Sequence, residues 1–361
     1  MIQILVRRDA IGTHEVRDAA TPQIGPGEIL LAVEQFAVTA NNVTYAAMGD
    51  AMKYWDFFPA AAKDSGAFGI VPVWGHAHVA ASNVEGFTVG ERVYGYLPMA
   101  SHLVASPGAI KPGSFVDTAA HRQHMASVYN QYRRLSSDPG HHPDREDIRS
   151  VFEPLFMTSW LIRAMFAREG WHGADTLVMT SASSKTALAL AHVAKAQSPE
   201  IARIGLTSAG NVDFVRGTGL YDRVLPYDGI AALAGANAVS VDFAGNGAVL
   251  RAVHEAIGDG LKYSCLVGLT HWEDRGGAGE MPGPKPILFF APSHMQAAIA
   301  EMGGDGFGRA VAQSWTAFAA DAAKLVRIEP VEGLAAGAEA FKALVNGSAK
   351  PDVGTVVRLT Q

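Results

Sequence analysis

The stretch DTLVMTSASSKTALALAHVAK, residues 175–195, decides the fold of this chain. Residues 176–180 form a short β-branched and apolar run, which is typical of a buried strand, and residues 186–195 are strong helix formers. The turn at residues 181–185 therefore lies where a new helix points its unpaired N–H groups. Such a turn attracts anions, so the stretch predicts the opening of a nucleotide-binding βαβ unit.

The composition of this turn departs from the usual pattern. Most dinucleotide folds place three glycines here so that the backbone can approach a pyrophosphate, whereas this chain has small hydroxyl residues and Lys185. An ATP-type phosphate loop needs glycine where Ser184 and Met179 stand, so that motif is disfavoured. Taken alone, the turn also fits a plain helix capped by Ser183 or Ser184, with Lys185 in solvent.

The segments that follow favour the nucleotide-binding reading over the plain capped helix. Strand-like runs at residues 204–208, 239–243 and 264–269 are separated by helix-like segments at residues 212–217 and 247–257. This alternation predicts a parallel sheet with crossover helices.

The end of the second strand sets the expected cofactor. An NAD-preferring fold places an acidic residue there to hold the ribose 2′-hydroxyl, but this chain has Ser208. The missing carboxylate favours NADP. We expect Ser183, Ser184, Lys185 and Thr186 around the phosphates, Ser208, Asn211 and Tyr227 near the adenosine ribose, and Thr158 and Gly268 as further cofactor-binding residues.

Length and composition fit a globular protein of about two domains. The 361 residues are 48% hydrophobic and 18% charged, and the net charge of −6 offers no basic surface for nucleic acid. No signal-peptide pattern and no run of about 18 apolar residues is present, so we expect a cytoplasmic protein without a membrane partner. The single cysteine, Cys265, excludes an internal disulfide and is expected to be buried in a strand.

The chain before residue 175 has a different texture. Short β-like runs alternate with Gly/Pro turns over residues 1–110, and residues 354–359 form another strand that returns to this region. We therefore expect an α/β protein: a β-rich, partly barrelled domain at residues 1–153 and 331–361, and a dinucleotide-binding Rossmann domain at residues 154–330.

The two halves together resemble the medium-chain dehydrogenase/reductase superfamily, particularly its zinc-independent quinone- and enone-reductase branch. The resemblance rests on GPGEILLAV at residues 25–33, VEGFTVGERVY at residues 84–94, the strand and turn at residues 175–186 and the tail at residues 334–359. The turn SASSKTA, with NNVTY at residues 41–45, is similar to the uncharacterised DUF2855 family. The resemblance implies a GroES-like domain joined to a Rossmann domain.

Residues 112–153 have no counterpart in that superfamily. Within them, residues 117–134 carry apolar and aromatic side chains at mixed spacings of three and four, which predicts a helix, and residues 136–150 are expected to form an exposed loop. We expect the helix to shape a pocket wall or a subunit contact.

Histidines are frequent, but they do not form a zinc pattern. The superfamily's catalytic zinc needs a cysteine and a Gly-His-Glu run, whereas Gly75-His76 is followed by Ala77 and no cysteine precedes it. His121 and His124, which the predicted helix would place on one face, are expected to be solvated or hydrogen-bonded. No metal is therefore expected.

Without a metal, hydrogen-bond donors must meet the charge that develops on the substrate. The resemblance places Asn41, Asn42 and Tyr45 at the catalytic site, with the equivalent amide being either Asn41 or Asn42. Tyr45 is expected to donate a hydrogen bond or a proton, and an aromatic packing role is equally open.

The resulting prediction is a zinc-independent, NADP-dependent oxidoreductase that transfers hydride to a small activated carbonyl or α,β-unsaturated carbonyl compound. The alternative is a non-catalytic NADP-binding sensor or structural protein. The apolar run at residues 286–292, bracketed by prolines, is expected to be an edge strand that pairs two copies into a homodimer.

Overall fold

The structure is a computed structural model, and it describes residues 1–267 and 281–359. The chain forms two compact units, one of Met1–Val151 with Arg327–Gln361 and one of Phe152–Val326. Among the described residues, no helix is long and apolar enough to cross a membrane.

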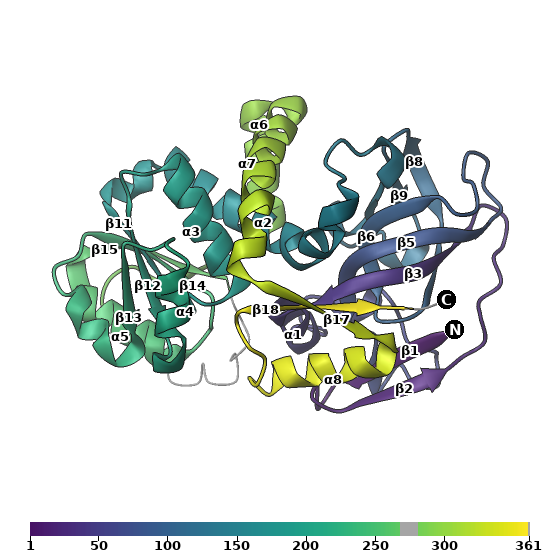
Figure 1. Cartoon of the computed structure of the whole chain (residues 1–361), viewed down its shortest axis with the longest axis horizontal. Coiled ribbons are helices and arrows are strands. Elements are labelled where there is room, and N and C mark those ends of the chain that lie inside the picture. Colours follow the sequence, from purple (N-terminus) through teal and green to yellow (C-terminus); the bar gives the residue numbers. More distant parts are fainter. Residues whose placement is uncertain (268–280, 360–361) are drawn as a thin grey trace. The chain divides into compact units, whose positions relative to one another are not determined.

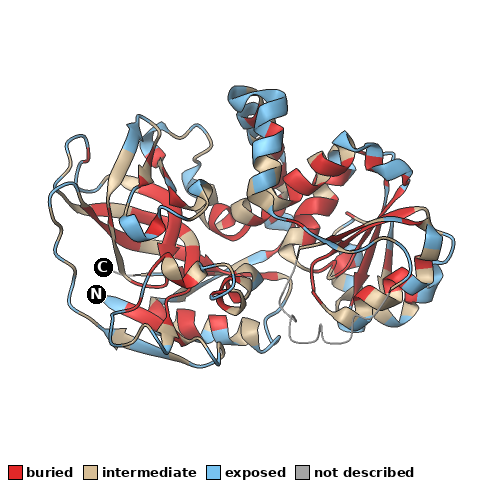
Figure 2. Ribbon diagram, turned by 180° about the vertical axis from the view of Figure 1, so that it is seen from behind, coloured by how far each residue is buried: buried red, intermediate tan, exposed pale blue. Residues whose placement is uncertain are grey.

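The second unit is built on a parallel sheet of six strands (Figure 1). Its order is β13-β12-β11-β14-β15-β16, with strands β11 (Thr176–Met179), β12 (Ala202–Thr207), β13 (Arg223–Pro226), β14 (Ala238–Asp242), β15 (Leu261–Leu266) and β16 (Ile287–Leu288). Helix α2 (Glu146–Arg168) belongs to this unit from Phe152 onward. The unit also contains α3 (Lys185–Gln197), α4 (Val212–Gly217), α5 (Gly247–Ile257), α6 (Ala291–Met302) and α7 (Gly304–Leu325). Every residue of β11 and β14 is buried, as expected for central strands covered on both faces (Figure 2).

The order of these strands is that of a doubly wound dinucleotide-binding sheet. Counted along the chain it reads 3-2-1-4-5-6, and the winding reverses between β11 and β14. Ligands of such sheets bind beyond the carboxyl ends of the strands at the reversal point. The end of β11, and the turn that follows it, therefore lie at the position where sheets of this type bind their ligands.

The first unit carries two β-sheets. One has the order β2-β1-β4 and comprises β1 (Ile2–Arg7), β2 (His14–Asp18) and β4 (Phe68–Gly69). The other runs β17-β18-β3-β5-β6-β10-β9-β8, with β7 paired to β3. Its strands are β3 (Ile29–Val38), β5 (Pro72–Ser82), β6 (Arg92–Pro98), β7 (His102–Ala105), β8 (Pro107–Lys111), β9 (Ser114–Asp117), β10 (Gln131–Arg134), β17 (Arg327–Glu332) and β18 (Val353–Arg358).

The C-terminal strand belongs to this first unit. β18 pairs antiparallel with β3, with Val356 opposite Ala37. Two helices accompany these strands, α1 (Ala40–Ala47) after β3 and α8 (Gly333–Val345) between β17 and β18. The expected α/β class, with a Rossmann-type sheet and a β-rich GroES-like part, is confirmed.

The helix expected at residues 117–134 is wrong. These residues form short 3-10 turns at Ala120–Arg122 and Ser127–Asn130, followed by strand β10. The reason is pairing with distant strands, because β10 joins both β9 and β6 and buries Tyr132 opposite Phe115. This tertiary pairing overrides the local helical spacing.

Two other expected elements differ in extent. The loop expected to reach residue 150 ends earlier, because helix α2 (Glu146–Arg168) begins at Glu146. The apolar run at residues 286–292 contains only the two-residue strand β16, because α6 begins at Ala291 with Pro292 in its first turn. Proline is compatible with a first helical turn but not with a continuing strand ladder.

Candidate functional site

The turn after β11 begins with an uncommon backbone conformation. Ser181 has a φ of 46°, in the left-handed region that non-glycine residues rarely adopt. Its backbone N–H donates to the hydroxyl of Tyr227 at 3.1 Å. Tyr227, expected near the adenosine ribose, therefore contacts the turn at residues 181–185.

Ser184 is the cap of helix α3. Its hydroxyl oxygen accepts a hydrogen bond from the N–H of Ala187 at 3.3 Å, while Lys185 and Thr186 begin the helix. A helix N-terminus carries a partial positive charge, and Lys185 adds a full one. The turn therefore has the electrostatics of an anion site with few glycines.

A glycine on the neighbouring strand provides close packing at this turn. A Cβ on Gly205 would lie 2.8 Å from the Cβ of Ala182 and 2.9 Å from the ring of Tyr221. The hydroxyl of Tyr221 donates to the carbonyl of Ala182 at 2.9 Å. Gly205 thus lets the turn and Tyr221 lie against β12.

The carboxyl end of β12 is joined to the turn. The Ser183 hydroxyl lies 3.2 Å from the Asn211 amide nitrogen and 3.3 Å from the Thr207 hydroxyl. Ser208, directly after β12, is exposed, and residues 207–211 contain no carboxylate. The structure therefore brings Ser183 and Asn211 together and leaves the end of β12 uncharged.

Of the two remaining predicted cofactor residues, one is described. Thr158 lies in α2, where its hydroxyl donates to the carbonyl of Pro154, and its neighbour Ser159 donates to the carbonyl of Thr186 at 2.8 Å. Thr158 is thus adjacent in sequence to a contact with the first turn of α3. Gly268 lies outside the described residues.

Sequence reasoning missed a buried polar pair at the reversal point. Thr180, which follows β11, donates to Asp242 at the end of β14 at 2.5 Å. Asp242 also accepts from the backbone N–H groups of Ala244 and Gly245. A signal was available, because Thr180 ends the predicted strand at residues 176–180 and Asp242 lies one residue before the end of the predicted strand at residues 239–243.

In the first unit, helix α1 carries the predicted catalytic residues. Asn41 donates its amide to the phenol oxygen of Tyr45 at 2.6 Å, and the indole N–H of Trp74 donates to the same oxygen at 3.3 Å. Asn42 instead points into the fold: its oxygen accepts from the Thr39 N–H and its nitrogen donates to the Pro72 carbonyl. Asn41 is therefore the amide beside Tyr45, and Asn42 is part of the helix cap.

The surroundings of Tyr45 keep its phenol protonated. Burial raises the pKa of Tyr45 well above 10, the neighbouring Tyr129 raises it further, and the hydrogen bonds from Trp74 and Asn41 partly oppose this. Since its oxygen already accepts two hydrogen bonds, Tyr45 can offer its proton to a third group.

Aromatic rings surround this phenol. The ring centroid of Tyr45 lies 4.6 Å from that of Tyr54, 5.5 Å from that of Tyr96 and 6.4 Å from that of Tyr129. Tyr54, Trp74 and Tyr129 are half-buried, whereas Tyr96 is fully buried. We call Tyr45, Tyr54, Trp74, Tyr96 and Tyr129 the tyrosine cluster.

Other large aromatic residues of the chain are Trp55, Phe57, Phe58, Phe289 and Phe290. The first three belong to the apolar core of the first unit. Phe289 and Phe290 lie in the second unit, after β16. Of these, Phe57 stacks against Tyr54 of the tyrosine cluster, with ring centroids 6.1 Å apart.

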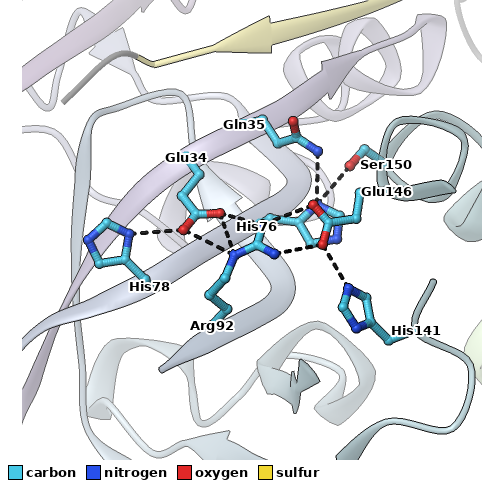
Figure 3. Close-up of polar contacts among 8 residues, drawn as sticks. All are labelled: Glu34, Gln35, His76, His78, Arg92, His141, Glu146 and Ser150. Carbon is cyan, nitrogen blue, oxygen red and sulfur yellow. Dashed lines mark hydrogen bonds and ion pairs between the residues drawn. The ribbon is translucent and has the colours of Figure 1, made fainter. Parts of the chain in front are cut away.

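A second polar network of the first unit was not predicted (Figure 3). Arg92 on β6 lies between two carboxylates, donating to Glu34 on β3 at 2.6 Å and to Glu146 of α2 at 2.8 Å. His78 lies 3.0 Å from Glu34, and His141 lies 2.7 Å from Glu146. The ionic groups come from four distant segments, so no local spacing could reveal them.

His76 lies beside this network and stays uncharged. Its Nδ1 atom lies 3.2 Å from the Ser150 hydroxyl and 3.5 Å from the Gln35 amide nitrogen. Burial lowers the pKa of His76 to about 3. Among residues 1–267 and 281–359, no group of three or more His, Cys, Asp and Glu side chains could hold a metal ion.

Comparisons with known proteins agree with this architecture. The sequence profile of a family described as "Protein of unknown function (DUF2855)" matches residues 36–350. A search of curated proteins found no match.

Among solved structures, CurA from Vibrio vulnificus in complex with NADPH has a TM-score of 0.63 at 16% identity, with both chains covered fully. The CurK enoyl reductase has a TM-score of 0.58 at 13% identity, over 99% of each chain. The yhdH oxidoreductase from Salmonella enterica, in complex with NADP, has a TM-score of 0.57 at 14% identity over both full chains. The fold is therefore shared with these three proteins.

Proposed function

We propose that this chain, which belongs to the DUF2855 family, is an NADP-dependent oxidoreductase that transfers hydride to a small carbonyl or α,β-unsaturated carbonyl compound. The observation that carries the proposal is the turn at residues 181–185, which lies at the reversal point of a 3-2-1-4-5-6 sheet and carries Lys185. Similar folds with NADPH or NADP bound, in CurA and yhdH, support the assignment.

The phosphate-binding residues are proposed from the geometry of the turn. The N-terminus of α3, the hydroxyls of Ser183, Ser184 and Thr186, and the ammonium group of Lys185 would receive the pyrophosphate. Tyr227 covers the turn through its bond to Ser181. Thr158 and Gly268 complete the proposed cofactor set.

The preference for NADP rests on the end of β12. Ser208 is exposed there, and no carboxylate would repel the 2′-phosphate or bind a free 2′-hydroxyl. Asn211, held near Ser183, adds a neutral amide donor. NADPH should therefore bind more tightly than NADH.

The chain's own contribution to the reaction is a proton donor and a hydrogen-bond network. When bound, the cofactor supplies the hydride. Tyr45 would donate its hydrogen bond, and then its proton, to the acceptor as negative charge develops on it. Asn41 and Trp74, which donate to the Tyr45 oxygen, would stabilise the charge left on that oxygen.

The proposed reaction does not use zinc. Zinc-dependent medium-chain dehydrogenases need an acidic residue after Gly-His, where this chain has Ala77. The single cysteine of the chain, Cys265, lies buried in β15. The neutral donors around Tyr45 take the place of a Lewis acid.

The proposed assembly is a cytoplasmic homodimer formed through β16. Ile287 and Leu288 form the last strand of the parallel sheet, and they are 50% and 46% exposed. Phe290, directly after them, is 43% exposed. An uncovered apolar edge strand readily pairs with another chain.

A steady-state assay tests the proposed activity. NADPH oxidation at 340 nm would be followed with a panel of ketones, diketones and enones, with and without a chelator. Turnover that survives chelation supports the proposal. Tight NADPH binding without turnover of any acceptor would instead support a non-catalytic NADP-binding sensor.

A further inference from the structure

The tyrosine cluster has more phenol protons than hydrogen bonds that its hydroxyl groups donate. The Tyr45 oxygen accepts two hydrogen bonds, and Tyr54 and Tyr129 share a single one at 3.4 Å. The Tyr96 hydroxyl is fully buried and interacts with the Tyr45 hydroxyl, although no hydrogen bond of normal geometry joins it to a residue that the structure describes. The Tyr45 proton and one proton of the Tyr54–Tyr129 pair are still available for donation, so the cluster suits a ligand rich in acceptor oxygens.

The cluster also contributes aromatic surface. The half-buried ring of Tyr129 has its centroid 6.1 Å from that of Tyr54 and 6.2 Å from that of Trp74, and these two rings are half-buried as well. Such rings pack well on a flat conjugated molecule. Flat shape and acceptor oxygens together describe an aryl or conjugated carbonyl compound.

Tyr129 reaches this cluster from the 3-10 turn at Ser127–Asn130, directly before strand β10. The backbone carbonyl of Tyr129 accepts a hydrogen bond from the guanidinium of Arg122 at 2.8 Å. Arg122 also donates to Asp117 at 2.8 Å, to Asn130 at 2.9 Å and to the Tyr132 hydroxyl at 3.0 Å. Every arm of this fully buried guanidinium is therefore engaged.

The Arg122 site is more than a surface ion pair. The Arg122 and Asp117 side chains are 0% and 1% exposed, so both charges have lost their hydration and depend on each other and on their hydrogen bonds. The guanidinium also lies over the rings of Phe57 and Phe58, at 5.5 Å and 5.0 Å from their centroids. A buried ionic site of this kind fixes one backbone geometry, and here that geometry positions Tyr129.

We propose that Tyr129 determines the specificity of the acceptor site and that Arg122 is its positioning residue. Resting on the proposed function, this inference names the substrate class: a flat carbonyl acceptor that carries a second oxygen near the reducible carbonyl. Tyr45 donates its hydrogen bond to the carbonyl that receives hydride, and the Tyr54–Tyr129 hydroxyl pair binds the second oxygen. The hydride comes from NADPH and the proton from Tyr45, so the acceptor carbonyl becomes an alcohol.

The test compares two acceptors that differ by one carbonyl, 1-phenyl-1,2-propanedione and propiophenone. Tyr129→Phe removes only the hydroxyl, and Tyr263→Phe, on β15 of the other unit, is the matched control. We expect Tyr129→Phe to raise KM for the dione about tenfold, which corresponds to one lost hydrogen bond, with kcat and the propiophenone parameters within about twofold. Equal effects on the two acceptors, or none, would overturn the inference.

Arg122→Lys tests the positioning role, because it retains the charge but loses the forked geometry. We expect it to raise KM for the dione with little change in kcat. A purely structural role would instead lower the melting temperature and change both acceptors alike, and that result would remove Arg122 from the proposal. If Arg122→Lys does not fold, the Tyr129→Phe comparison decides alone.

Calorimetry of the dione, with NADP⁺ present in excess, separates this inference from the proposed function. Absence of turnover with every acceptor would contradict the proposed reaction. In that case, about tenfold weaker dione binding by Tyr129→Phe would still support the inferred ligand site. Equal binding by the wild type and Tyr129→Phe, or no binding by the wild type, would reject it.

Discussion

The side-chain amide of Asn41 donates a 2.6 Å hydrogen bond to the phenol oxygen of Tyr45, one turn further along helix α1. The pair joins a half-buried amide to a buried phenol whose oxygen also accepts from Trp74. Because both neighbours donate to this oxygen, the Tyr45 proton is directed to a third group. Tyr45, although its aromatic ring belongs to the core, is therefore a candidate general acid.

Removing the Tyr45 hydroxyl is expected to lower turnover without changing cofactor binding. Tyr45→Phe should reduce kcat on the order of a hundredfold, the typical cost of losing one donor to a developing oxyanion. Asn41→Ala should have a smaller effect in the same direction. Steady-state kinetics and NADPH calorimetry check the prediction, and full activity in both variants would refute the role of this pair.

Asn42→Ala provides a contrast on the same helix. The side-chain amide of Asn42 forms hydrogen bonds with Thr39 and Pro72 at the helix cap. Its removal should therefore lower the free energy of unfolding by about 1 kcal/mol. Urea denaturation measures the loss. A large fall in kcat at unchanged stability would instead return Asn42 to the list of catalytic candidates.

Ser208→Asp is expected to reverse or abolish the preference for NADPH. The new carboxylate would stand after β12, where it would repel a 2′-phosphate and accept a hydrogen bond from a 2′-hydroxyl. The ratio of dissociation constants for NADPH and NADH is the readout. An unchanged ratio would show that the end of β12 does not face the ribose.

The ionic network at Glu146 predicts a pH dependence of stability. Burial raises the pKa of Glu146, but its hydrogen bonds with Arg92 and His141 outweigh burial and lower it from 4.5 to about 2. Because the pKa is lowered in the folded state, the Glu146 carboxylate stabilises the fold at a pH above its pKa in the unfolded chain. This contribution is lost as the pH falls from about 4.5 to about 2.

Glu146→Gln should therefore lower the free energy of unfolding by about 1 kcal/mol at pH 7, since Arg92 keeps Glu34 as a partner and is partly exposed. The difference in free energy of unfolding between the wild type and the variant should become smaller as the pH falls from 4.5 to 2. Denaturant titrations at pH 7, 4 and 2.5 measure it, and a constant gap across this range would contradict the assigned ion pair.

The proposed dimer has its own test. Ile287→Lys places a charge on the exposed edge strand β16, where Ile287 is half exposed, and should convert a dimer into a monomer with little effect on folding. Sedimentation at micromolar concentration gives the mass. A wild-type mass equal to one chain would contradict the proposed dimer. If the Ile287→Lys variant is still a dimer, the dimer interface does not include β16.

The sequence was most informative where local pattern and tertiary structure agree. The strand and helix around the 181–185 turn, the helices at residues 212–217 and 247–257, and the return of the last strand to the first unit are all found. Parallel strands buried on both faces are recognisable as apolar runs in the sequence. The sequence offered Ser183 or Ser184 as the cap of the following helix, and the structure has Ser184 there. These features depend on neighbours in the chain.

Prediction failed where distant residues decide the conformation. Residues 117–134 have helical spacing, yet Tyr132 pairs with Phe115 in a strand and Arg122 bonds Asp117. The Glu34–Arg92–Glu146 network likewise joins β3, β6 and α2. Which of Asn41 and Asn42 lies beside Tyr45 depended on where Pro72 lies, and no spacing rule supplies that.

NADP binding by this protein can be measured by calorimetric titration of the wild type with NADPH and, separately, with NADH. We expect both nucleotides to bind through the Lys185 turn and NADPH to bind at least about tenfold more tightly, a difference of about 1.4 kcal/mol. Lys185→Ala should weaken both. Tighter binding of NADH, or no binding of either nucleotide, would contradict the account.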